Sequence, residues 1–396
     1  MEQISGVDLI RELDIKNIKE NPGQMVTIDA CVHKIRDMSG FAFVILRTGK
    51  HLIQCIYEEE KCENELSQIS VGSYISATGH SRLESRANLG FEVILTGFKI
   101  LSQPAEDYPL NVGHKRLGCG LEANLDHRSV ALRNPREKAV FKIQESVVSG
   151  FREFMESQGF TQVHTPKIVA AGAEGGANIF KLDYFNQDAY LAQSPQFYKQ
   201  TCVAFFDRVF EIAPVYRAEK HNTSRHLNEY IGLDFEMGYI NSMCDVMEME
   251  TAMIKYVIEY LKNHSQEYLD ILDVKLPQID TIPSITFMEA LEFMKSEQGG
   301  KNKYDLEPED EVFLCNYAKK QWGSEFLFIT HFPASKRPFY AMNDRNDPRF
   351  ALSFDLLFRG LEITTGGQRI HDYNEQVDKM KEMGMEPDDL KSYLEI

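Results

Sequence analysis

The stretch 211–236, EIAPVYRAEKHNTSRHLNEYIGLDFE, constrains the fold of this chain more than any other. Its flanks, 209–216 and 230–239, alternate like two strands, and the charged loop between them predicts a hairpin. The loop carries two arginines and two carboxylates, Arg217, Arg225, Glu219 and Glu229. Guanidinium groups pair bidentately with phosphate oxygens and keep their charge at any working pH, which suits a triphosphate. A solvated hairpin with surface ion pairs explains the same residues equally well.

The order of residues in the loop favours the first interpretation. Arg217-Ala218-Glu219, followed by Arg225-His226-Leu227-Asn228-Glu229-Tyr230, resembles motif 2 of class II aminoacyl-tRNA synthetases, in the form found in aspartyl-tRNA synthetases of archaeal and eukaryotic type. The resemblance covers nearly the whole chain. It implies an α+β fold, with an OB-fold barrel before a catalytic domain whose antiparallel sheet is flanked by helices. It also implies an ATP-dependent aspartate–tRNA ligase.

Length and composition agree with a protein of this kind. The 396 residues, 43% of them hydrophobic, are enough for two or more domains with buried cores. No apolar run approaches a membrane span, and the opening MEQISGVDLIRELD lacks the regions of a signal peptide. Seven cysteines without a CxxC pair argue against disulfides and a zinc site. We therefore expect a soluble cytoplasmic protein with no membrane partner.

The formal charge of -17 opposes a nucleic-acid partner, because phosphate contacts need Lys and Arg. Charge alone would predict a metabolic enzyme. The basic residues are unevenly placed, however, and one group consists of Lys115, Arg116, Arg128, Arg133, Arg136, Lys138 and Lys142. A local patch of this kind can still bind RNA, and solvated linker charge is the alternative for each single residue.

Residues 1–103 are expected to form a small β domain. Strand-like runs separated by turn residues lie at 25–32, 41–46, 52–57, 74–80 and 91–101. Five short strands suit an OB-fold, a platform for single-stranded nucleic acid, and the resemblance makes this the anticodon-binding domain. Residues 104–134, rich in Pro and Gly, are expected to be a linker, and 135–396 the catalytic domain.

The resemblance assigns three residues to the central anticodon base. Phe43 would stack on it, while Gln54 and Glu92 would read its edge. Without the resemblance, a core Phe43 and a solvated Gln54 would be the simpler interpretation. His33 stands where strict family members often carry tryptophan, and histidine there resembles enzymes that charge both tRNA(Asp) and tRNA(Asn). Asn88, at the second such position, fits neither group, so a solvated strand histidine is the alternative.

A dimer element follows the linker. Apolar residues at helical spacing predict a helix over 137–158, ended by Gly159. The run 160–168 predicts a strand containing Pro166, which is tolerated only at an edge or an interface. A long helix followed by such a strand resembles motif 1 of class II synthetases, which implies a homodimer.

The resemblance also implies an aspartate site. In the small-residue run 170–176, Glu174 would receive the substrate α-ammonium group. The run YLAQSPQFYK at 190–199 matches the family's aspartate-binding segment and favours aspartate over asparagine. Lys199 and Arg369 would face the side-chain carboxylate, the latter bidentately. The full set is Glu174, Gln196, Lys199, Arg217, Asp234, Thr365 and Arg369.

ATP would be bound mainly by the hairpin, through Arg217, Glu219, Arg225, His226, Leu227, Tyr230 and Glu362. Arg217 would hold the α-phosphate, Arg225 the outer phosphates, and Tyr230 would stack on adenine. Asp355 and Glu362 suit Mg²⁺, with a hydroxyl from Thr365; a structural ion pair is the alternative for Asp355. Arg217 and Glu362 are the implied catalytic residues. Gly366 and Gly367 would let the backbone approach the ligand.

The remaining segments give weaker signals. A helix is predicted over 243–263, a modest helical insertion over 277–322 and a strand over 326–330, and Tyr340 resembles a residue near the substrate pocket. Family members continue past the helix that ends here at Ile396 into motif 3, a glycine-rich strand and helix with an arginine that covers adenine. Two interpretations therefore stay open: a truncated form of an active ligase, or a non-catalytic paralogue that binds tRNA or aspartate. A third, an asparagine-forming ligase of related fold, is disfavoured by the OB-like domain.

Overall fold

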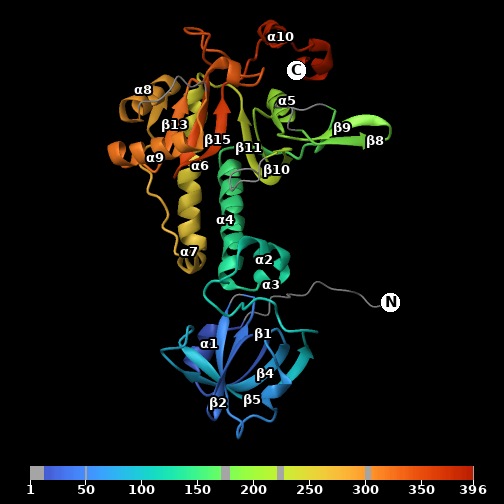
Figure 1. Cartoon of the computed structure of the whole chain (residues 1–396), viewed down its shortest axis with the longest axis vertical. Helices are drawn as coiled ribbons and strands as arrows, with labels where there is room; N and C mark the ends of the chain where they lie inside the picture. Colours follow the sequence, from blue (N-terminus) through green and yellow to red (C-terminus); the bar gives the residue numbers. More distant parts are fainter. Residues whose placement is uncertain (1–12, 50, 171–178, 221–226, 299–304, 396) are drawn as a thin grey trace. The chain divides into compact units, whose positions relative to one another are not determined.

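This computed structural model describes residues 13–49, 51–170, 179–220, 227–298 and 305–395 (Figure 1). The chain divides into two compact units, Met1–Phe141 and Lys142–Ile396. Within the described ranges, no helix combines the length and the apolar character that crossing a membrane requires. All seven cysteines lie in these ranges and are free thiols, as expected.

The first unit contains a closed five-stranded barrel. Its elements are α1 (Ile15–Glu20), β1 (Met25–Met38), β2 (Phe41–Arg47), β3 (Leu52–Tyr57), the 3₁₀ turn η1 (Leu66–Gln68), β4 (Tyr74–Leu83) and β5 (Phe91–Ser102). The strands close in the order β1-β2-β3-β5-β4. Alternate side chains, among them Val32, Val44 and Leu46, turn into a fully buried core. The expected OB-fold barrel is confirmed.

Two short helices occupy part of the segment 104–134, where the sequence indicated no periodic structure. They are α2 (Leu121–Asp126) and α3 (Arg128–Ala131), and the long helix α4 (Pro135–Ser157) follows. Asn134 fixes the start of α4. Its side-chain nitrogen donates to the carbonyls of Val112 and His114, and its oxygen accepts the N–H of Arg136. The helix predicted over 137–158 is confirmed and begins two residues earlier.

The second unit has two main sheets. One runs in the order β11-β10-β6 and consists of β6 (Thr161–Gln162), β10 (Arg208–Tyr216) and β11 (Glu229–Met237). The other runs β12-β13-β14-β15 and consists of β12 (Ser284–Thr286), β13 (Phe326–Thr330), β14 (Ser353–Phe358) and β15 (Leu361–Gly367). A small sheet is formed by β7 (Ile168–Val169), β8 (Lys181–Tyr184) and β9 (Gln187–Leu191). The predicted hairpin is confirmed as β10 and β11.

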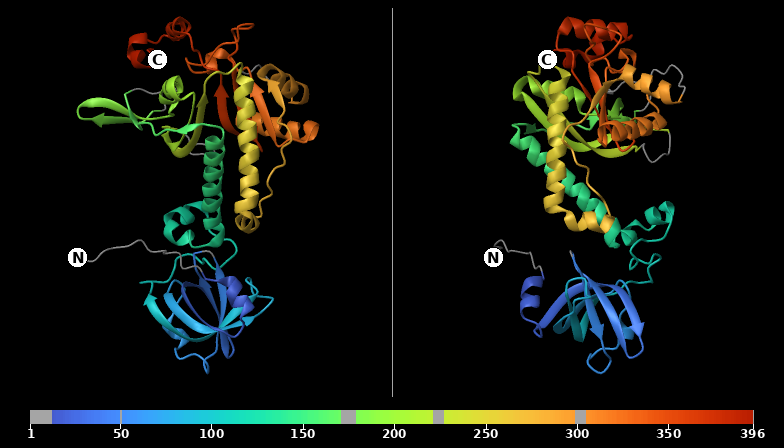
Figure 2. Two further views of the ribbon diagram at one scale, coloured as in Figure 1. Left: turned by 180° about the vertical axis from the view of Figure 1, so that it is seen from behind. Right: turned by 90° about the vertical axis from the view of Figure 1, so that its left-hand side faces the viewer.

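Helices surround these sheets (Figure 2). They are α5 (Gln196–Phe206), α6 (Met243–His264), α7 (Gln266–Leu272), α8 (Phe287–Gln298), α9 (Pro308–Trp322), α10 (Tyr373–Glu382) and α11 (Lys391–Leu394), with the 3₁₀ turns η2 (Ala334–Lys336) and η3 (Pro387–Leu390). Helices α4 and α6 lie side by side, and the hydroxyls of Ser146 and Ser265 are 2.6 Å apart. Helices α8 and α9 are the predicted insertion, to which the structure adds β12.

Strand alternation separates an apolar face from a polar one. On the β10–β11 hairpin, Phe210, Leu233 and Phe235 pack into the core that includes α4 and α6. In the larger sheet, Phe354 and Leu356 of β14 join residues of α6, while Leu357 joins a core with α8 and α9. Because successive side chains point to opposite faces, the polar residues between these apolar ones gather away from α6.

One sequence expectation about the strands is wrong. The single strand expected over 160–168 is split into β6 and β7, which belong to different sheets, and Pro166, which has no N–H for a ladder, lies between them. The two glycines of β15, which line a cavity of the second unit, are also needed for packing. A Cβ on Gly366 would lie 2.3 Å from the Phe354 ring, and one on Gly367 would lie 2.7 Å from the Leu352 carbonyl oxygen. Close packing of β15 against its own neighbours requires both.

Candidate functional site

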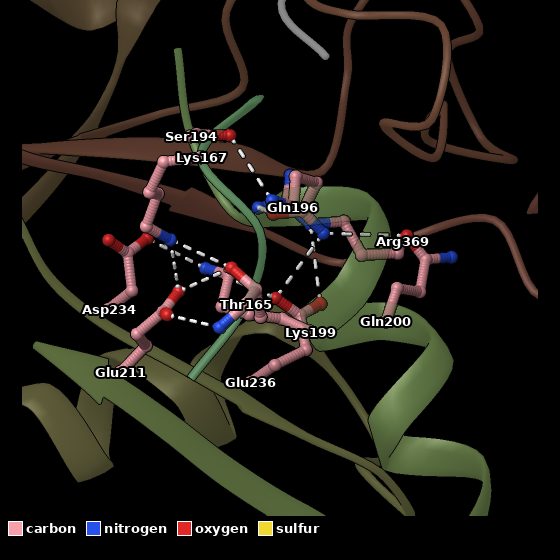
Figure 3. A network of polar contacts seen from close by, with 10 residues as sticks. All are labelled: Thr165, Lys167, Ser194, Gln196, Lys199, Gln200, Glu211, Asp234, Glu236 and Arg369. Carbon is pink, nitrogen blue, oxygen red and sulfur yellow. Dashed lines mark hydrogen bonds and ion pairs between the residues drawn. The ribbon is translucent and has the colours of Figure 1, made fainter. Parts of the chain in front are cut away.

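A network of charged and amide side chains covers the polar face of the β10–β11 hairpin (Figure 3). Lys199 Nζ, from α5, lies 2.8 Å from Asp234 Oδ1 and 3.6 Å from Glu236 Oε2. Arg369, just after β15, places its Nε 3.6 Å from Glu236 Oε1 and donates from Nη2 to Gln196 Oε1 at 3.2 Å. Two cations from distant segments therefore meet at one carboxylate. All four charged side chains line a cavity of about 370 Å³, within the range of small-molecule sites.

Lys199 keeps its charge although it is only 5% exposed. Burial opposes ionisation, but the carboxylates of Asp234 and Glu236 outweigh it, and the pKa of Lys199 lies above its ordinary value. A buried ammonium group remains charged only with such partners. The network therefore holds a permanent cation at the cavity.

A third carboxylate, that of Glu211, stabilises the hairpin from the same face (Figure 3). Glu211 is the Cα partner of Asp234 in the β10–β11 pairing. It accepts hydrogen bonds from the N–H and hydroxyl of Thr165, at 2.6 and 2.8 Å, and from Lys167 Nζ at 2.9 Å. These contacts tie the segment between β6 and β7 to the hairpin.

Arg217 lies at the other end of this face, directly after β10. Its N–H donates to the Asn228 carbonyl at 3.0 Å, and its guanidinium carbon lies 6.0 Å from the centroid of the Tyr230 ring. Its Nε is buried and has no hydrogen-bond partner among the described residues. Tyr230 and Asp234 are four residues apart on β11, so they share a face at a spacing of roughly 13 Å. An arginine end and a carboxylate end thus occupy one surface.

Asp355 and Glu362 form a separate acidic pair on β14 and β15. Asp355 is the Cα partner of Thr365, whose hydroxyl donates to Glu362 Oε1 at 2.7 Å. Arg337 donates to Asp355 Oδ2 at 2.8 Å, so the ion pair considered from the sequence exists. Asp355 Oδ1 is buried and accepts no hydrogen bond within the described ranges. An unbonded carboxylate oxygen beside a second carboxylate fits Mg²⁺, which takes one or two carboxylates plus substrate phosphates.

The surroundings of the acidic pair raise the pKa of both carboxyl groups. Desolvation raises the pKa of Glu362 to about 7, and the neighbouring Asp355 carboxylate adds to the shift. Burial raises the pKa of Asp355 as well, against the Arg337 charge. Among the described residues, no group of three or more His, Cys, Asp or Glu side chains is placed to hold a metal ion, so a cation here would rely on its other ligands.

A hollow of about 590 Å³ on the barrel brings together the three residues expected to contact the anticodon. Phe43 lies edge-on to Phe41, with ring centroids 5.3 Å apart. Gln54 Nε2 donates to Glu92 Oε2 at 2.8 Å, and Arg82 Nε donates to Glu92 Oε1 at 3.0 Å. Half-buried aromatic rings beside fixed polar groups suit an unstacked base. Gln54 is therefore bound in a network rather than simply solvated.

His33 does not line this hollow. It is 5% exposed, at a bulge of β1 between Val32 and Lys34. Burial, together with Arg47, lowers its pKa to about 4, so the imidazole is neutral at working pH. The alternative of a solvated strand histidine is wrong. Asn88 is exposed in the turn between β4 and β5.

Comparison with known proteins now identifies the family. The model for class II tRNA synthetases (D, K and N) matches residues 120–396, which is more than half of the chain. The chain belongs to this synthetase family. The model for the OB-fold nucleic acid binding domain matches residues 26–101 of this synthetase, which is the barrel.

The names of similar proteins include both aspartate–tRNA ligases and an asparaginyl-tRNA synthetase. The aspartate–tRNA(Asp/Asn) ligase of Deinococcus radiodurans is 40% identical over 96% of this chain and 88% of its own length. The aspartate–tRNA(Asp) ligase of Pyrococcus horikoshii is 37% identical over 95% and 87%. Among solved structures, the asparaginyl-tRNA synthetase of Pyrococcus horikoshii has a TM-score of 0.89 at 26% identity, covering 98% of this chain and 90% of that one. The fold is therefore similar to that of an asparagine enzyme as well, whereas the two relatives with the higher sequence identity are both named aspartate–tRNA ligases.

The structure of the synthetase groups most of the residues expected at its site. Gln196, Lys199, Asp234 and Arg369 form one network, and Tyr340 lies beneath the Arg369 guanidinium carbon, 4.9 Å from its ring centroid. Arg217 and Tyr230 lie at the hairpin end, where the Glu219 N–H donates to the Arg217 carbonyl at 2.8 Å. Leu227 is 61% exposed. Glu174, Arg225 and His226 lie outside the described residues.

Several residues of the site were not predicted from the sequence of the synthetase. Glu236 could have been predicted from strand periodicity, because it follows Asp234 by two residues and a strand places both on one face. Gln200 had a weaker signal, since it follows Gln196 by one helical turn. Arg337 had none: it is 18 residues from Asp355 and lies in the segment after the 3₁₀ turn η2.

Proposed function

We propose that this synthetase is an aspartate–tRNA ligase that activates L-aspartate with ATP and transfers it to tRNA(Asp). The proposal depends on the convergence of Lys199 and Arg369 at Glu236, beside a cavity on the Arg217 face. Two fixed cations suit the side-chain carboxylate of aspartate, whereas the neutral amide of asparagine would leave them poorly matched. Asp234, paired with Lys199, lines the same cavity and would face the amino acid. The ligase names of the relatives support the same substrate.

The two reacting groups would be bound at opposite ends of one face, the ATP phosphates at Arg217 and the amino acid at Lys199 and Arg369. Arg217 binds and neutralises the α-phosphate while the aspartate α-carboxylate attacks it, which forms aspartyl-adenylate and releases pyrophosphate. A terminal hydroxyl of the tRNA next takes the aspartyl group and releases AMP. Neither step requires a protein nucleophile, because orientation and charge stabilisation supply the catalysis. Tyr230 offers its ring to adenine.

ATP is the substrate of class II synthetases, and Mg²⁺ is typical of the family. Asp355, Glu362 and the Thr365 hydroxyl are the residues that would hold the ion, which supplies charge neutralisation at the phosphates. Arg337 limits the charge of this pair through its contact with Asp355.

We further propose that residues 1–103 bind the anticodon, with 104–134 as linker and 135–396 as catalytic domain. Phe43 would stack on the central base, while Gln54 and Glu92 would read its edge. His33 could influence the choice between tRNA(Asp) and tRNA(Asn) only indirectly, by shaping the barrel, because it is buried. The Asp/Asn name of one relative supports tRNA(Asn) as a second substrate. A cytoplasmic homodimer is part of the proposal.

Aspartate-dependent exchange between ATP and pyrophosphate tests the proposed function, with L-asparagine at equal concentration as the comparison. We expect exchange with aspartate only, and calorimetric binding of aspartate to the free protein. Absence of both would overturn the proposal. Binding without exchange would instead favour a non-catalytic protein that binds aspartate or tRNA.

Transcripts of the two tRNAs test the nucleic-acid substrates. We expect charging of tRNA(Asp), and formation of Asp-tRNA(Asn) if the enzyme is of the dual type. No detectable Asp-tRNA(Asn) beside normal Asp-tRNA(Asp) would exclude the dual type and leave the ligase activity intact.

A further inference from the structure

The polar network of the aspartate pocket continues through Gln200, which itself lines the cavity, to Tyr393. Gln200, one turn after Gln196 on α5, lies between three segments of the second unit. Its Nε2 donates to the Ile370 carbonyl at 3.3 Å, next to Arg369. Its Oε1 accepts the hydroxyl of Tyr393, from α11, at 2.9 Å. The same oxygen lies 3.4 Å from Gln196 Nε2. One amide thus joins α5, the segment after β15, and α11.

The hydrogen bonds that run from Ile370 through Gln200 and Gln196 to Arg369 have a direction that is fixed at both ends. A carbonyl oxygen only accepts, so the nitrogen of Gln200 faces Ile370 and its oxygen faces Gln196. A guanidinium only donates, so the oxygen of Gln196 faces Arg369, and its nitrogen faces Gln200 and Glu236 Oε2 at 3.3 Å. A rotation of the Gln200 amide by 180° would set two NH₂ groups against each other. The Ile370 carbonyl opposes that rotation too, because it can bond only to the NH₂ group, and in the present orientation the Tyr393 hydroxyl adds a hydrogen bond to the Gln200 oxygen.

Tyr393 is built into the fold as a donor. Its side chain is 8% exposed and packs on Phe197 and Phe339, with ring centroids 4.9 and 5.8 Å away. Burial raises the pKa of Tyr393 above its ordinary value, so the hydroxyl stays protonated at working pH. A phenylalanine ring would keep these aromatic contacts. The hydroxyl can therefore be removed with little change in packing.

We propose that Tyr393 is a positioning residue for amino-acid binding. Its hydroxyl orients Gln200, which orients Gln196 and, through it, the Arg369 guanidinium that faces the aspartate carboxylate. The proposal rests on the proposed function, since it assigns a role within the same pocket. It predicts that loss of the Tyr393 hydroxyl weakens binding of the amino acid and leaves ATP binding unchanged, because Arg217 and Tyr230 lie at the other end of the hairpin.

The test replaces the hydroxyl and compares the two substrates. Calorimetry gives the Kd of L-aspartate for the free protein, and the exchange assay gives KM for aspartate and for ATP. For Tyr393→Phe we expect the Kd and KM of aspartate to rise about fivefold, the scale of one hydrogen bond. We expect KM for ATP, kcat and the melting temperature to stay close to those of the wild type.

Two further variants make the result specific. Tyr373→Phe, at an exposed position 58% accessible to solvent, should leave aspartate binding unchanged. Gln200→Leu should weaken aspartate binding at least as much as Tyr393→Phe, and adding Tyr393→Phe to it should have no further effect, because the two residues act in series.

Three outcomes would overturn the proposal: an unchanged aspartate Kd in Tyr393→Phe, equal losses for aspartate and ATP, or additive effects with Gln200→Leu. A wild-type protein that binds no aspartate would be a different result, since it would reject the proposed function itself.

Discussion

At the scale of single residues, the two ends of the site differ in how their charges are satisfied. Lys199 is buried and already paired with Asp234 and Glu236, so its position is set before any substrate arrives. Arg217 is less committed, because its buried Nε has no hydrogen bond within the described ranges. A donor held without a partner costs stability and gains most from an incoming anion. Phosphate binding at Arg217 would supply that partner.

Replacing Arg217 tests this difference. In Arg217→Ala we expect adenylate formation to fall at least about a hundredfold, the scale of losing one preorganised charge donor. Aspartate binding to the free protein should change little, because Lys199 and Arg369 remain. Pyrophosphate exchange and calorimetry measure the two quantities. Arg349→Ala, at a side chain 81% exposed, is the matched control and should exchange normally. Near-normal exchange in Arg217→Ala would remove the assigned role.

At the scale of elements, local sequence patterns predict most of the helices and strands but few of the contacts that form the site. The barrel strands, the hairpin and helix α6 follow from periods of two and 3.6, because one face of each element is buried. The break at Pro166 and the pairing of Arg337 with Asp355 depend on which segments meet in space, which spacing along the chain does not encode. Even the convergence of Lys199 and Arg369 came from family resemblance, since 170 positions separate them.

Helix α6 also carries a buried acid beneath β15. Glu250 is 1% exposed, and burial, with a contribution from Asp355, raises its pKa to about 7 from 4.5. Below pH 4.5 the carboxyl is neutral in both the folded and the unfolded state. Between pH 4.5 and 7 the unfolded state ionises first, so stability falls as the pH rises and levels off above 7. The difference between the folded-state and the unfolded-state pKa of Glu250 corresponds to a loss of about 3 kcal/mol in the free energy of unfolding.

Glu250→Gln removes this pH dependence. We expect its free energy of unfolding to rise relative to that of the wild type by about 2 to 3 kcal/mol between pH 5 and pH 8. The single tryptophan, Trp322 on α9, reports denaturant unfolding of the second unit by fluorescence. Glu248→Gln, exposed on the same helix, should show no such trend. A constant difference between Glu250→Gln and wild type across this range would refute the buried ionisation.

At the scale of the whole molecule, α4 carries exposed apolar side chains near its start. Val140 is 52% exposed and Phe141 is 47% exposed, near the start of the helix that resembles motif 1. Water contact with such residues on a long helix is unfavourable, and a second copy of the chain would cover them. We therefore expect these two residues to contribute to the surface of the proposed homodimer.

Sedimentation at micromolar concentration tests the dimer. We expect a species of twice the 45.5 kDa of one chain. Val140→Asp should shift the population toward monomer by placing a charge in the apolar contact, with an unchanged melting profile at low concentration. Glu156→Lys, exposed near the end of the same helix, is the control and should remain dimeric. A wild type that sediments only as a 45.5 kDa species would contradict the proposal.

The register of β10 against β11 has a consequence for evolution and engineering. Asp234 and Glu236 reach the cavity only because Leu233 and Phe235 fill the core on the other side. Inserting or deleting one amino acid in β11 would exchange the two sets, burying acids among aromatics and exposing the aromatics to water. Any viable length change in this hairpin must therefore be confined to its tip or come in steps of two, while substitutions can be accepted singly.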